Sequence, residues 1–344
     1  MPPPGPYEAP ARRRHPFRDV RLHVVSGKGG TGKTTVAAAL ALALASGGHK
    51  VLLVEVEGRQ GLAQLFDSPP LPYEERKIAS GAGGGEVFAL AIDPEAALLE
   101  YLELFYNMKR AGRALKRLGA VDFATTIAPG LRDVLLTGKA KEAVSREDKS
   151  RRLGLAYDCV VMDAPPTGRI ARFLNVTAEV AGLAKVGPVR GQAESVMALL
   201  RSPRTAVHLV TLLEEMPTQE TRDGTRELRS QVFPVGAIVI NKMRPPLLPK
   251  SELARARSGS LDRGELAAGL KEVGIDAEPE LLTALLEEAA DHARRVELEN
   301  AERRALADLR RPSYELPLLT DVDRVDLGGL YRLADLLRAQ GMVG

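Results

Sequence analysis

The chain has 344 residues, of which 44% are apolar, 27% are charged and 4% are aromatic. Its 48 basic and 45 acidic residues nearly balance, which argues against a nucleic acid or an anionic membrane surface as a partner. The single cysteine, Cys159, excludes an internal disulfide and any zinc site within the chain that needs two thiolates, and it fits a reducing, cytoplasmic compartment.

Residues 1–18 are rich in proline and then in arginine, which predicts a flexible N-terminal tail. In residues 19–344, short apolar runs alternate with helical stretches, which predicts an α/β fold with a doubly wound, mostly parallel sheet. Ligands of such sheets bind beyond the carboxyl ends of the strands. The expected strands are Leu22–Val25, Val51–Glu55, Val87–Ala91, Cys159–Asp163, Ala206–Val210, Ala237–Ile240 and Tyr314–Leu316.

Two connections are too long for a simple crossover between strands, at about residues 94–155 and about residues 243–311. The first opens with Asp93-Pro94, a cap and first-turn pair that predicts the start of a helix. It also contains the apolar stretch Leu98–Tyr106, for which we favour packing within a helical subdomain over a groove for a partner helix. We expect both connections to be helical insertions.

A phosphate-binding pattern, G-x-x-x-x-G-K-[ST], follows the first expected strand and opens a helix. Its residues are Gly27, Lys28, Gly29, Gly30, Thr31, Gly32, Lys33 and Thr34. We expect the loop N–H groups and Lys33 to bind the β- and γ-phosphates, the Thr34 hydroxyl to bind Mg²⁺, and Thr35 to reach the α-phosphate. The motif therefore predicts a Mg-ATP site.

The second metal ligand that the sequence offers is Asp163, at the carboxyl end of an apolar strand, a position that suits a carboxylate holding Mg²⁺ through water. The chain continues Ala-Pro-Pro-Thr-Gly-Arg169, which resembles the Asp-Thr-Ala-Pro-Thr-Gly-His signature of the arsenite-pump (ArsA) and tail-anchored-protein targeting ATPases. With the second lysine of the loop, Lys28, it also resembles the deviant Walker-A group. From about residue 21 to about residue 337 the chain looks like an actinobacterial ArsA-related ATPase.

This resemblance implies roles for residues that the motif does not fix. Lys28 matches the lysine that reaches across a dimer interface to the partner's nucleotide, where its charge acts as an arginine finger does. Glu57 stands where the family has an aspartate that orients the attacking water, and Glu55 is its nearby competitor. Asn241 matches the asparagine that reads adenine, and Pro317 matches the segment that packs on adenine.

The chain also departs from its relatives. It has no Cys-x-x-Cys pair to clamp zinc between subunits, and Cys159 alone cannot form the thiolate cluster that arsenite needs. Arg169 stands where the signature has histidine. These departures disfavour an arsenite or anion pump subunit and a tail-anchored-protein targeting factor.

We therefore predict a cytoplasmic, Mg-dependent dimeric switch ATPase, which couples its nucleotide state to a client or a membrane partner. The dimer is formed with a second copy or with a paralogous ATPase subunit, and a membrane-protein client would place it at the membrane periphery. The alternative is a regulatory subunit that binds nucleotide with little turnover and pairs with a paralogous ATPase. The intact Lys28 and Asp163 favour the first reading, whereas Glu57 and Arg169 leave the second open.

Overall fold

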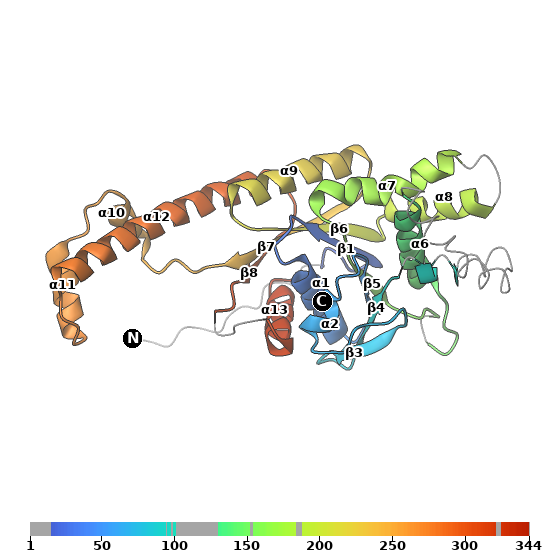
Figure 1. The fold of residues 1–344 in the computed structure, drawn as a ribbon, viewed down its shortest axis with the longest axis horizontal. Coiled ribbons are helices and arrows are strands. Elements are labelled where there is room, and N and C mark those ends of the chain that lie inside the picture. Colours follow the sequence, from blue (N-terminus) through green and yellow to red (C-terminus); the bar gives the residue numbers. More distant parts are fainter. Residues whose placement is uncertain are drawn as a thin grey trace.

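The computed structural model describes residues 15–93, 95–97, 99–100, 130–151, 154–183, 188–320 and 325–343. Within these residues the chain forms an eight-stranded sheet in the order β3-β4-β2-β5-β1-β6-β7-β8 (Figure 1). β3 is antiparallel to β4, and the other neighbouring strands are parallel. The strands are β1 (Leu22–Gly27), β2 (Lys50–Glu55), β3 (Arg76–Ser80), β4 (Glu86–Ala91), β5 (Cys159–Asp163), β6 (Thr205–Thr211), β7 (Val235–Met243) and β8 (Ser313–Pro317).

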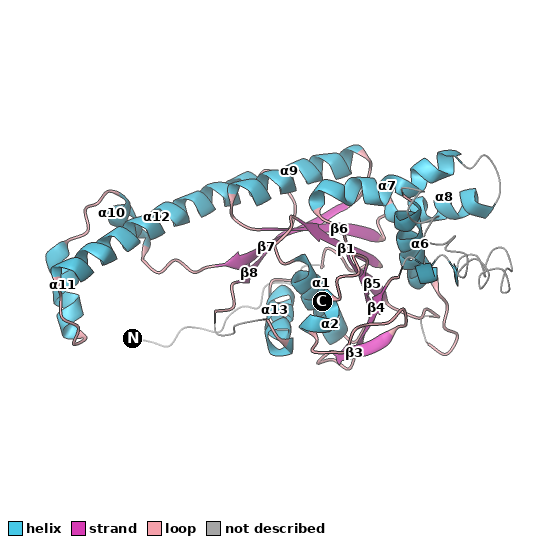
Figure 2. Ribbon diagram, in the orientation of Figure 1, coloured by secondary structure: helices cyan, strands magenta, loops and turns pink. Residues whose placement is uncertain are grey.

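Helices cover both faces of this sheet (Figure 2). On one face α1 (Lys33–Ser46) and α13 (Leu327–Ala339) pack against alternate strand residues such as Val25 and Leu53. On the other face, residues such as Val24 and Leu52 share a core with α6 (Leu131–Ser145), α7 (Thr167–Leu183), α8 (Pro188–Leu200) and α9 (Glu215–Ser230). The predicted doubly wound fold is confirmed, and burial on both faces explains why the strands are apolar throughout.

All seven expected strands are present, and the structure adds one that the sequence analysis missed. β3 reads Arg-Lys-Ile-Ala-Ser, has no buried residue and lies at the edge of the sheet beside β4. Lys77 of β3 pairs with Glu86 of β4 at 2.7 Å. Charged side chains suit an edge strand because they discourage pairing with another chain, and the same polarity hides such a strand from a search for apolar runs.

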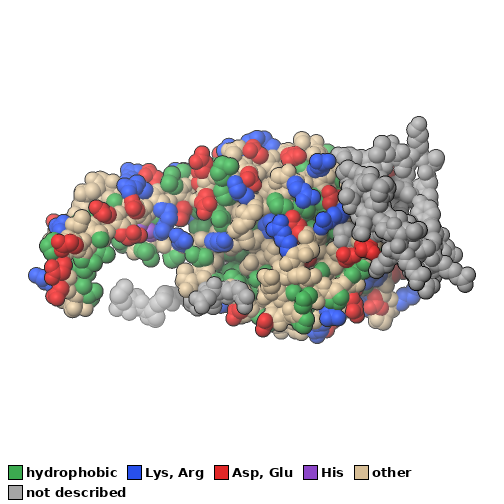
Figure 3. Space-filling view, in the orientation of Figure 1, with side chains coloured by type: hydrophobic (Ala, Val, Ile, Leu, Met, Phe, Trp, Pro, Cys, Tyr) green, Lys and Arg blue, Asp and Glu red, His purple; other side chains and the backbone are tan. Residues whose placement is uncertain are grey.

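The long connection between β7 and β8 forms an arm that extends away from the sheet (Figure 1). It contains α10 (Lys250–Arg257), α11 (Arg263–Glu272) and the long α12 (Pro279–Ala307), which packs on α10. The Arg229 guanidinium at the end of α9 donates to the Leu309 carbonyl at 2.8 Å and ties the arm to the sheet domain. Acidic and basic side chains are mixed along the arm (Figure 3).

The other long connection is described in part. It ends with α6, while residues 101–129, and with them most of the apolar stretch 98–106, lie outside the described residues.

The residue before α2 (Gly61–Leu65), Gln60, has a positive φ of 56°, so the chain turns sharply after β2. Within the described residues, no helix combines the length and the apolar character that a membrane span requires.

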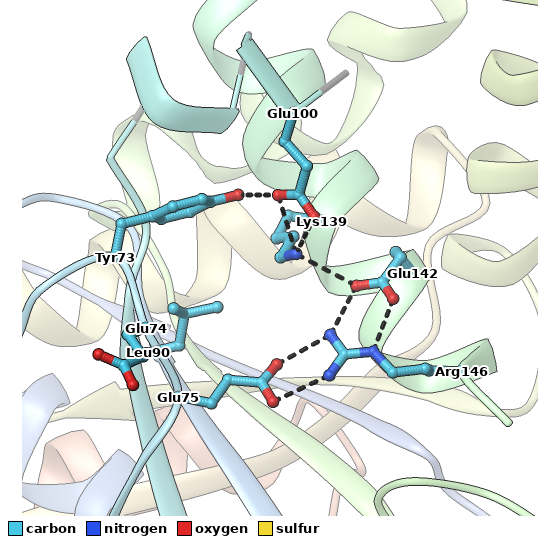
Figure 4. A pocket seen from close by; sticks show the side chains of 8 residues that line it. All are labelled: Tyr73, Glu74, Glu75, Leu90, Glu100, Lys139, Glu142 and Arg146. Atoms are coloured by element: carbon cyan, nitrogen blue, oxygen red, sulfur yellow. Dashed lines mark hydrogen bonds and ion pairs between the residues drawn. The ribbon is translucent and has the colours of Figure 1, made fainter. Parts of the chain in front are cut away.

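A ring of ion pairs fastens α6 to the edge of the sheet around a cavity of about 570 Å³ (Figure 4). Arg146 joins Glu142 at 2.7 Å and Glu75 at 2.8 Å, and Lys139 joins Glu100 at 2.8 Å. Burial disfavours ionisation of Glu75 and Glu142, but hydrogen bonds from Arg146 outweigh it and hold the pKa of both carboxyls below their usual range. The cavity is lined by Tyr73, Glu74, Glu75, Leu90, Glu100, Lys139, Glu142 and Arg146.

Two buried histidines stack in the centre of the sheet, His23 on β1 and His208 on β6. The Ala237 N–H donates to His208 Nδ1 at 3.1 Å, so His208 carries its proton on Nε2 and donates it to His23 Nδ1 at 3.0 Å. The ring of Phe17, which the sequence analysis assigned to the tail, is buried edge-on against His208, while residues 1–14 lie outside the described residues. Burial lowers the pKa of both histidines, that of His208 to about 3.

We expect these histidines to make the fold sensitive to acid. In the unfolded chain His208 takes up a proton near pH 6.5, whereas in the folded chain it stays neutral until about pH 3. The contribution of His208 to the free energy of unfolding is therefore complete above pH 6.5 and is lost progressively as the pH falls below that value. At pH 5 His208 alone lowers the free energy of unfolding by about 2 kcal/mol. Urea unfolding at pH 7 and pH 5 measures this loss. It should shrink in His208→Gln and persist in the control His49→Gln, an exposed site; equal losses in both variants would contradict the assignment.

Candidate nucleotide-binding site

The loop between β1 and α1 is shaped by its glycines and by one threonine. Gly30 and Gly32 have φ of 86° and 88°, in the left-handed region that side chains rarely adopt. The Thr31 hydroxyl donates to the Lys28 carbonyl at 2.8 Å and closes the loop. No side chain of the described residues caps α1 at Gly32, and no acid lies in its first turn. The first N–H groups of α1, around Thr34 and Thr35, are therefore oriented to bind an anion.

The last residues of β7 support this loop from the side. The Asn241 amide donates to the Thr31 carbonyl at 2.9 Å, and the Lys242 ammonium donates to the Gly30 carbonyl at 3.0 Å. Pro317, at the end of β8, lies in register with Met243 of β7. Of the two residues expected at adenine, Asn241 thus contacts the loop from near the end of β7, and Pro317 ends the neighbouring strand β8. Lys242 is a loop-supporting residue that the sequence analysis missed.

The start of α1 and the end of β5 bring the two expected metal ligands together. The Thr34 hydroxyl donates to Asp163 Oδ2 at 2.7 Å, while Asp163 Oδ1 is buried without a hydrogen-bond partner among the described residues. Burial raises the pKa of Asp163 to about 6, Thr34 and Lys33 oppose that rise, and Glu55 and Glu57 add to it. A buried carboxylate that has one oxygen without a partner among the described residues, and that lies near other acids, is well suited to bind a cation, so these residues fit Mg²⁺.

Replacing Asp163 with asparagine should weaken the dependence on Mg²⁺ more than the binding of nucleotide. A ligand that holds the metal through water typically contributes about 10- to 100-fold to metal affinity or activity. Turnover measured against Mg²⁺ concentration should therefore shift by that factor, with ATP affinity nearly constant. Asp158→Asn, one residue before the start of the same strand, is the control. Coincident Mg²⁺ titrations for wild type and Asp163→Asn would rule out the metal role.

The two acids at the end of β2, Glu55 within the strand and Glu57 just after it, have different environments. Glu55 is buried and accepts from the backbone N–H groups of Gln60 at 2.6 Å and Leu62 at 3.0 Å. Its carboxylate therefore folds the loop that follows β2. Glu57 is partly exposed, with Arg59 3.8 Å away, and its carboxylate accepts no backbone hydrogen bond from the residues that the structure describes. The water-orienting role expected of Glu57 stays a prediction, and Glu55, its competitor, is engaged by the backbone.

The Lys28 side chain forms an ion pair within its own subunit. Its Nζ lies 2.9 Å from Glu220 Oε1 on α9. Glu220 could not be predicted from the sequence, because 192 positions separate it from Lys28 and no motif links the two residues. Thr167, at the start of α7, is buried, and its hydroxyl has no partner in the described part of the chain.

Within the described residues, no group of three or more His, Cys, Asp or Glu side chains could hold a metal ion.

A parallel α/β sheet with this loop between its first strand and helix defines a P-loop nucleoside triphosphatase fold. Residues 20–200 match the family model of the anion-transporting ATPases. The chain is 56% identical over 323 residues to the ATPase BagA of Mycobacterium tuberculosis, which covers 94% of each protein. The chain belongs to the anion-transporting ATPase family, which confirms the resemblance seen in the sequence and supports a nucleotide-binding ATPase domain.

More distant relatives lie in the same family. The chain is 28% identical over 250 residues to the arsenical pump-driving ATPase of Escherichia coli, covering 67% of this chain and 40% of that protein. It is 27% identical over 252 residues to the ATPase get3 of Schizosaccharomyces japonicus, covering 64% of this chain and 73% of that protein.

Proposed function

We propose that this chain is a Mg-dependent ATP hydrolase that works as a dimer and couples its nucleotide state to a client. The contact between Thr34 and Asp163 is the observation that carries the proposal. It sets a hydroxyl and a carboxylate 2.7 Å apart at the start of α1, beside a loop whose N–H groups are oriented to bind phosphate. The other oxygen of Asp163, Oδ1, is buried without a partner among the described residues.

The remaining residues divide the reaction between them. Lys33 and the loop N–H groups bind the β- and γ-phosphates, while Thr34 and Asp163 hold Mg²⁺, which neutralises charge that develops on the phosphates. Glu57 orients the attacking water, and Lys28 supplies positive charge to the nucleotide of the partner subunit. Catalysis then rests on positioning and electrostatics, as phosphoryl transfer requires.

The adenine base and the α-phosphate of the nucleotide are contacted by different residues. Asn241 and Pro317, at the ends of β7 and β8, bind adenine, and Thr35 binds the α-phosphate. The contact between Asn241 and the Thr31 carbonyl supports this reading, because it joins the adenine-binding edge of the sheet to the phosphate loop. A base that orders Asn241 would therefore also order the loop.

A regulatory subunit with little turnover is the second candidate. It is favoured by the ion pair between Lys28 and Glu220, which holds the trans-acting lysine within its own chain. In that case a paralogous ATPase subunit would complete the dimer, and this chain alone would turn over slowly. In either case the protein is cytoplasmic, and a membrane-protein client would bring it to the membrane periphery.

Transport of a soft metalloid is disfavoured by the state of the cysteine. Cys159 lies buried in β5, and burial raises the pKa of its thiol to about 12. A thiol that stays protonated, with no second thiol in the chain, is a poor ligand for arsenite. The relative from Escherichia coli is named for an arsenical pump, and we do not extend that substrate to this chain.

Replacing Lys33 with alanine tests the nucleotide site directly. Loss of a charged hydrogen bond to phosphate should weaken Mg-ATP binding by about 100-fold. Isothermal titration with Mg-ATP measures the change, and thermal unfolding without nucleotide should stay at the wild-type temperature. Lys77→Ala, on the exposed edge strand, is the control. Unchanged affinity in Lys33→Ala would remove the basis for an ATPase.

A further inference from the structure

The ion pair between Lys28 and Glu220 joins the phosphate loop to α9. The two charged atoms are 2.9 Å apart, and the side chains are 30% and 35% exposed. The backbone at residue 28 is fixed, because its carbonyl accepts from both the hydroxyl and the N–H of Thr31. The loop therefore fixes the position of the Lys28 backbone, and the ion pair with Glu220 fixes the position of the Lys28 ammonium.

The same face of α9 also touches the segment that follows the metal acid. Gly224 lies one helical turn after Glu220, and a Cβ at Gly224 would stand 2.4 Å from Thr167 Cγ2. Thr167 begins α7, four residues after Asp163. Glycine at position 224 thus lets α9 approach α7 closely while Glu220 reaches Lys28. α9 is in contact with both sides of the candidate nucleotide site.

We propose that Glu220 is a positioning residue, which holds Lys28 within its own subunit until the nucleotide of a partner subunit competes for it. The inference rests on the proposed action of Lys28 in trans. A phosphate chain carries more negative charge than one carboxylate, so a nucleotide can win the ammonium once the subunits close. Because the pair is partly exposed, it holds the lysine weakly enough to be exchanged.

The ion pair between Lys28 and Glu220 then opposes dimer formation. Every closed dimer must break two such pairs, one in each subunit. Removing the carboxylate should therefore tighten ATP-dependent dimerisation, by about 2- to 5-fold for each pair broken, as is typical of exposed ion pairs. Without nucleotide the ammonium has no phosphate to reach, so dimerisation should not change. The difference should shrink as salt is raised, because salt screens the pair.

The experiment uses the full chain with Mg²⁺ and a non-hydrolysable ATP analogue. Sedimentation measures the dimer dissociation constant of wild type, Glu220→Gln and the control Asp223→Asn, which breaks an exposed pair with Arg226 on the same helix. We expect Glu220→Gln to tighten the dimer and Asp223→Asn to match wild type. In a Lys28→Ala background, Glu220→Gln should have no effect, which a general effect on α9 could not produce.

A second measurement reports the pair without requiring a dimer. The rate at which an amine-reactive ester labels Lys28 in the nucleotide-free chain should rise about 2- to 5-fold in Glu220→Gln, because the carboxylate no longer shields the amine. Labelling of Lys77 should stay constant. Unchanged labelling, an unchanged or weaker dimer, or a tighter dimer that does not depend on Lys28 would each overturn the inference.

The two proposals fail in different ways. If Lys28→Ala hydrolyses ATP at the wild-type rate, the proposed action of Lys28 in trans is wrong, and so is the proposed positioning role of Glu220. If Lys28→Ala loses hydrolysis but Glu220→Gln has the wild-type dimer constant, the proposed function stands and Glu220 has no positioning role.

Discussion

Replacing Lys28 with alanine is expected to lower the rate of ATP hydrolysis by about 10³-fold and to leave Mg-ATP binding within a few-fold of wild type. A charge supplied by a partner subunit meets the γ-phosphate in the closed dimer, where it stabilises the transition state rather than the bound ground state. A steady-state ATPase assay and isothermal titration on the same preparation separate the two effects.

Action in trans also predicts complementation between two inactive variants. A hybrid of Lys28→Ala and Lys33→Ala has one site with an intact Lys33 in its loop and an intact Lys28 from its partner. Mixtures should therefore regain part of the activity as subunits exchange, with light scattering to confirm dimers. Two results would contradict the role: full activity of Lys28→Ala alone, or mixtures no more active than their components.

Replacing Gly27 with alanine should produce the largest loss of stability in the phosphate loop. A Cβ at this position would stand 2.2 Å from the Val210 carbonyl oxygen on β6, and a backbone atom in the centre of the sheet cannot move aside cheaply. Overpacking of this kind costs about 1–3 kcal/mol and here we expect the upper end. Urea unfolding without nucleotide measures the loss.

Gly29 provides the matched control for that substitution. It lies in the same loop, but a Cβ there would meet nothing within 4 Å. Gly29→Ala should therefore unfold at nearly the wild-type urea concentration. If both variants lost the same stability, the loss would come from loop flexibility and not from the contact with Val210.

Apolar runs located the strands because each runs through a core that is buried on both sides. Val51–Glu55 and Cys159–Asp163 could be read as strands for that reason, and the register of β2 with β5 brings Glu55 beside Asp163. β3 could not be found this way, because Arg76 and Lys77 face solvent at the sheet edge. The arm was expected as helical, but its projection from the sheet depends on how α12 packs on α9 and α10.

The sequence by itself determined the α/β class, the phosphate loop of Gly27 to Thr34 and the acid at the end of β5. These features depend on neighbours in the chain, since a loop between a strand and a helix is built from consecutive residues. A resemblance added the expectations for Lys28, Glu57, Asn241 and Pro317, which stay predictions.

The tertiary structure alone decided which distant groups meet. It set Glu220 against Lys28, and Asn241 and Lys242 against the carbonyls of the loop. It also distinguished the two acids at the end of β2, because Glu55 accepts from two backbone N–H groups, and in the described part of the chain Glu57 accepts from none. Each of these contacts depends on side-chain direction and on packing between elements, and residues that are far apart in sequence carry no local pattern that records either.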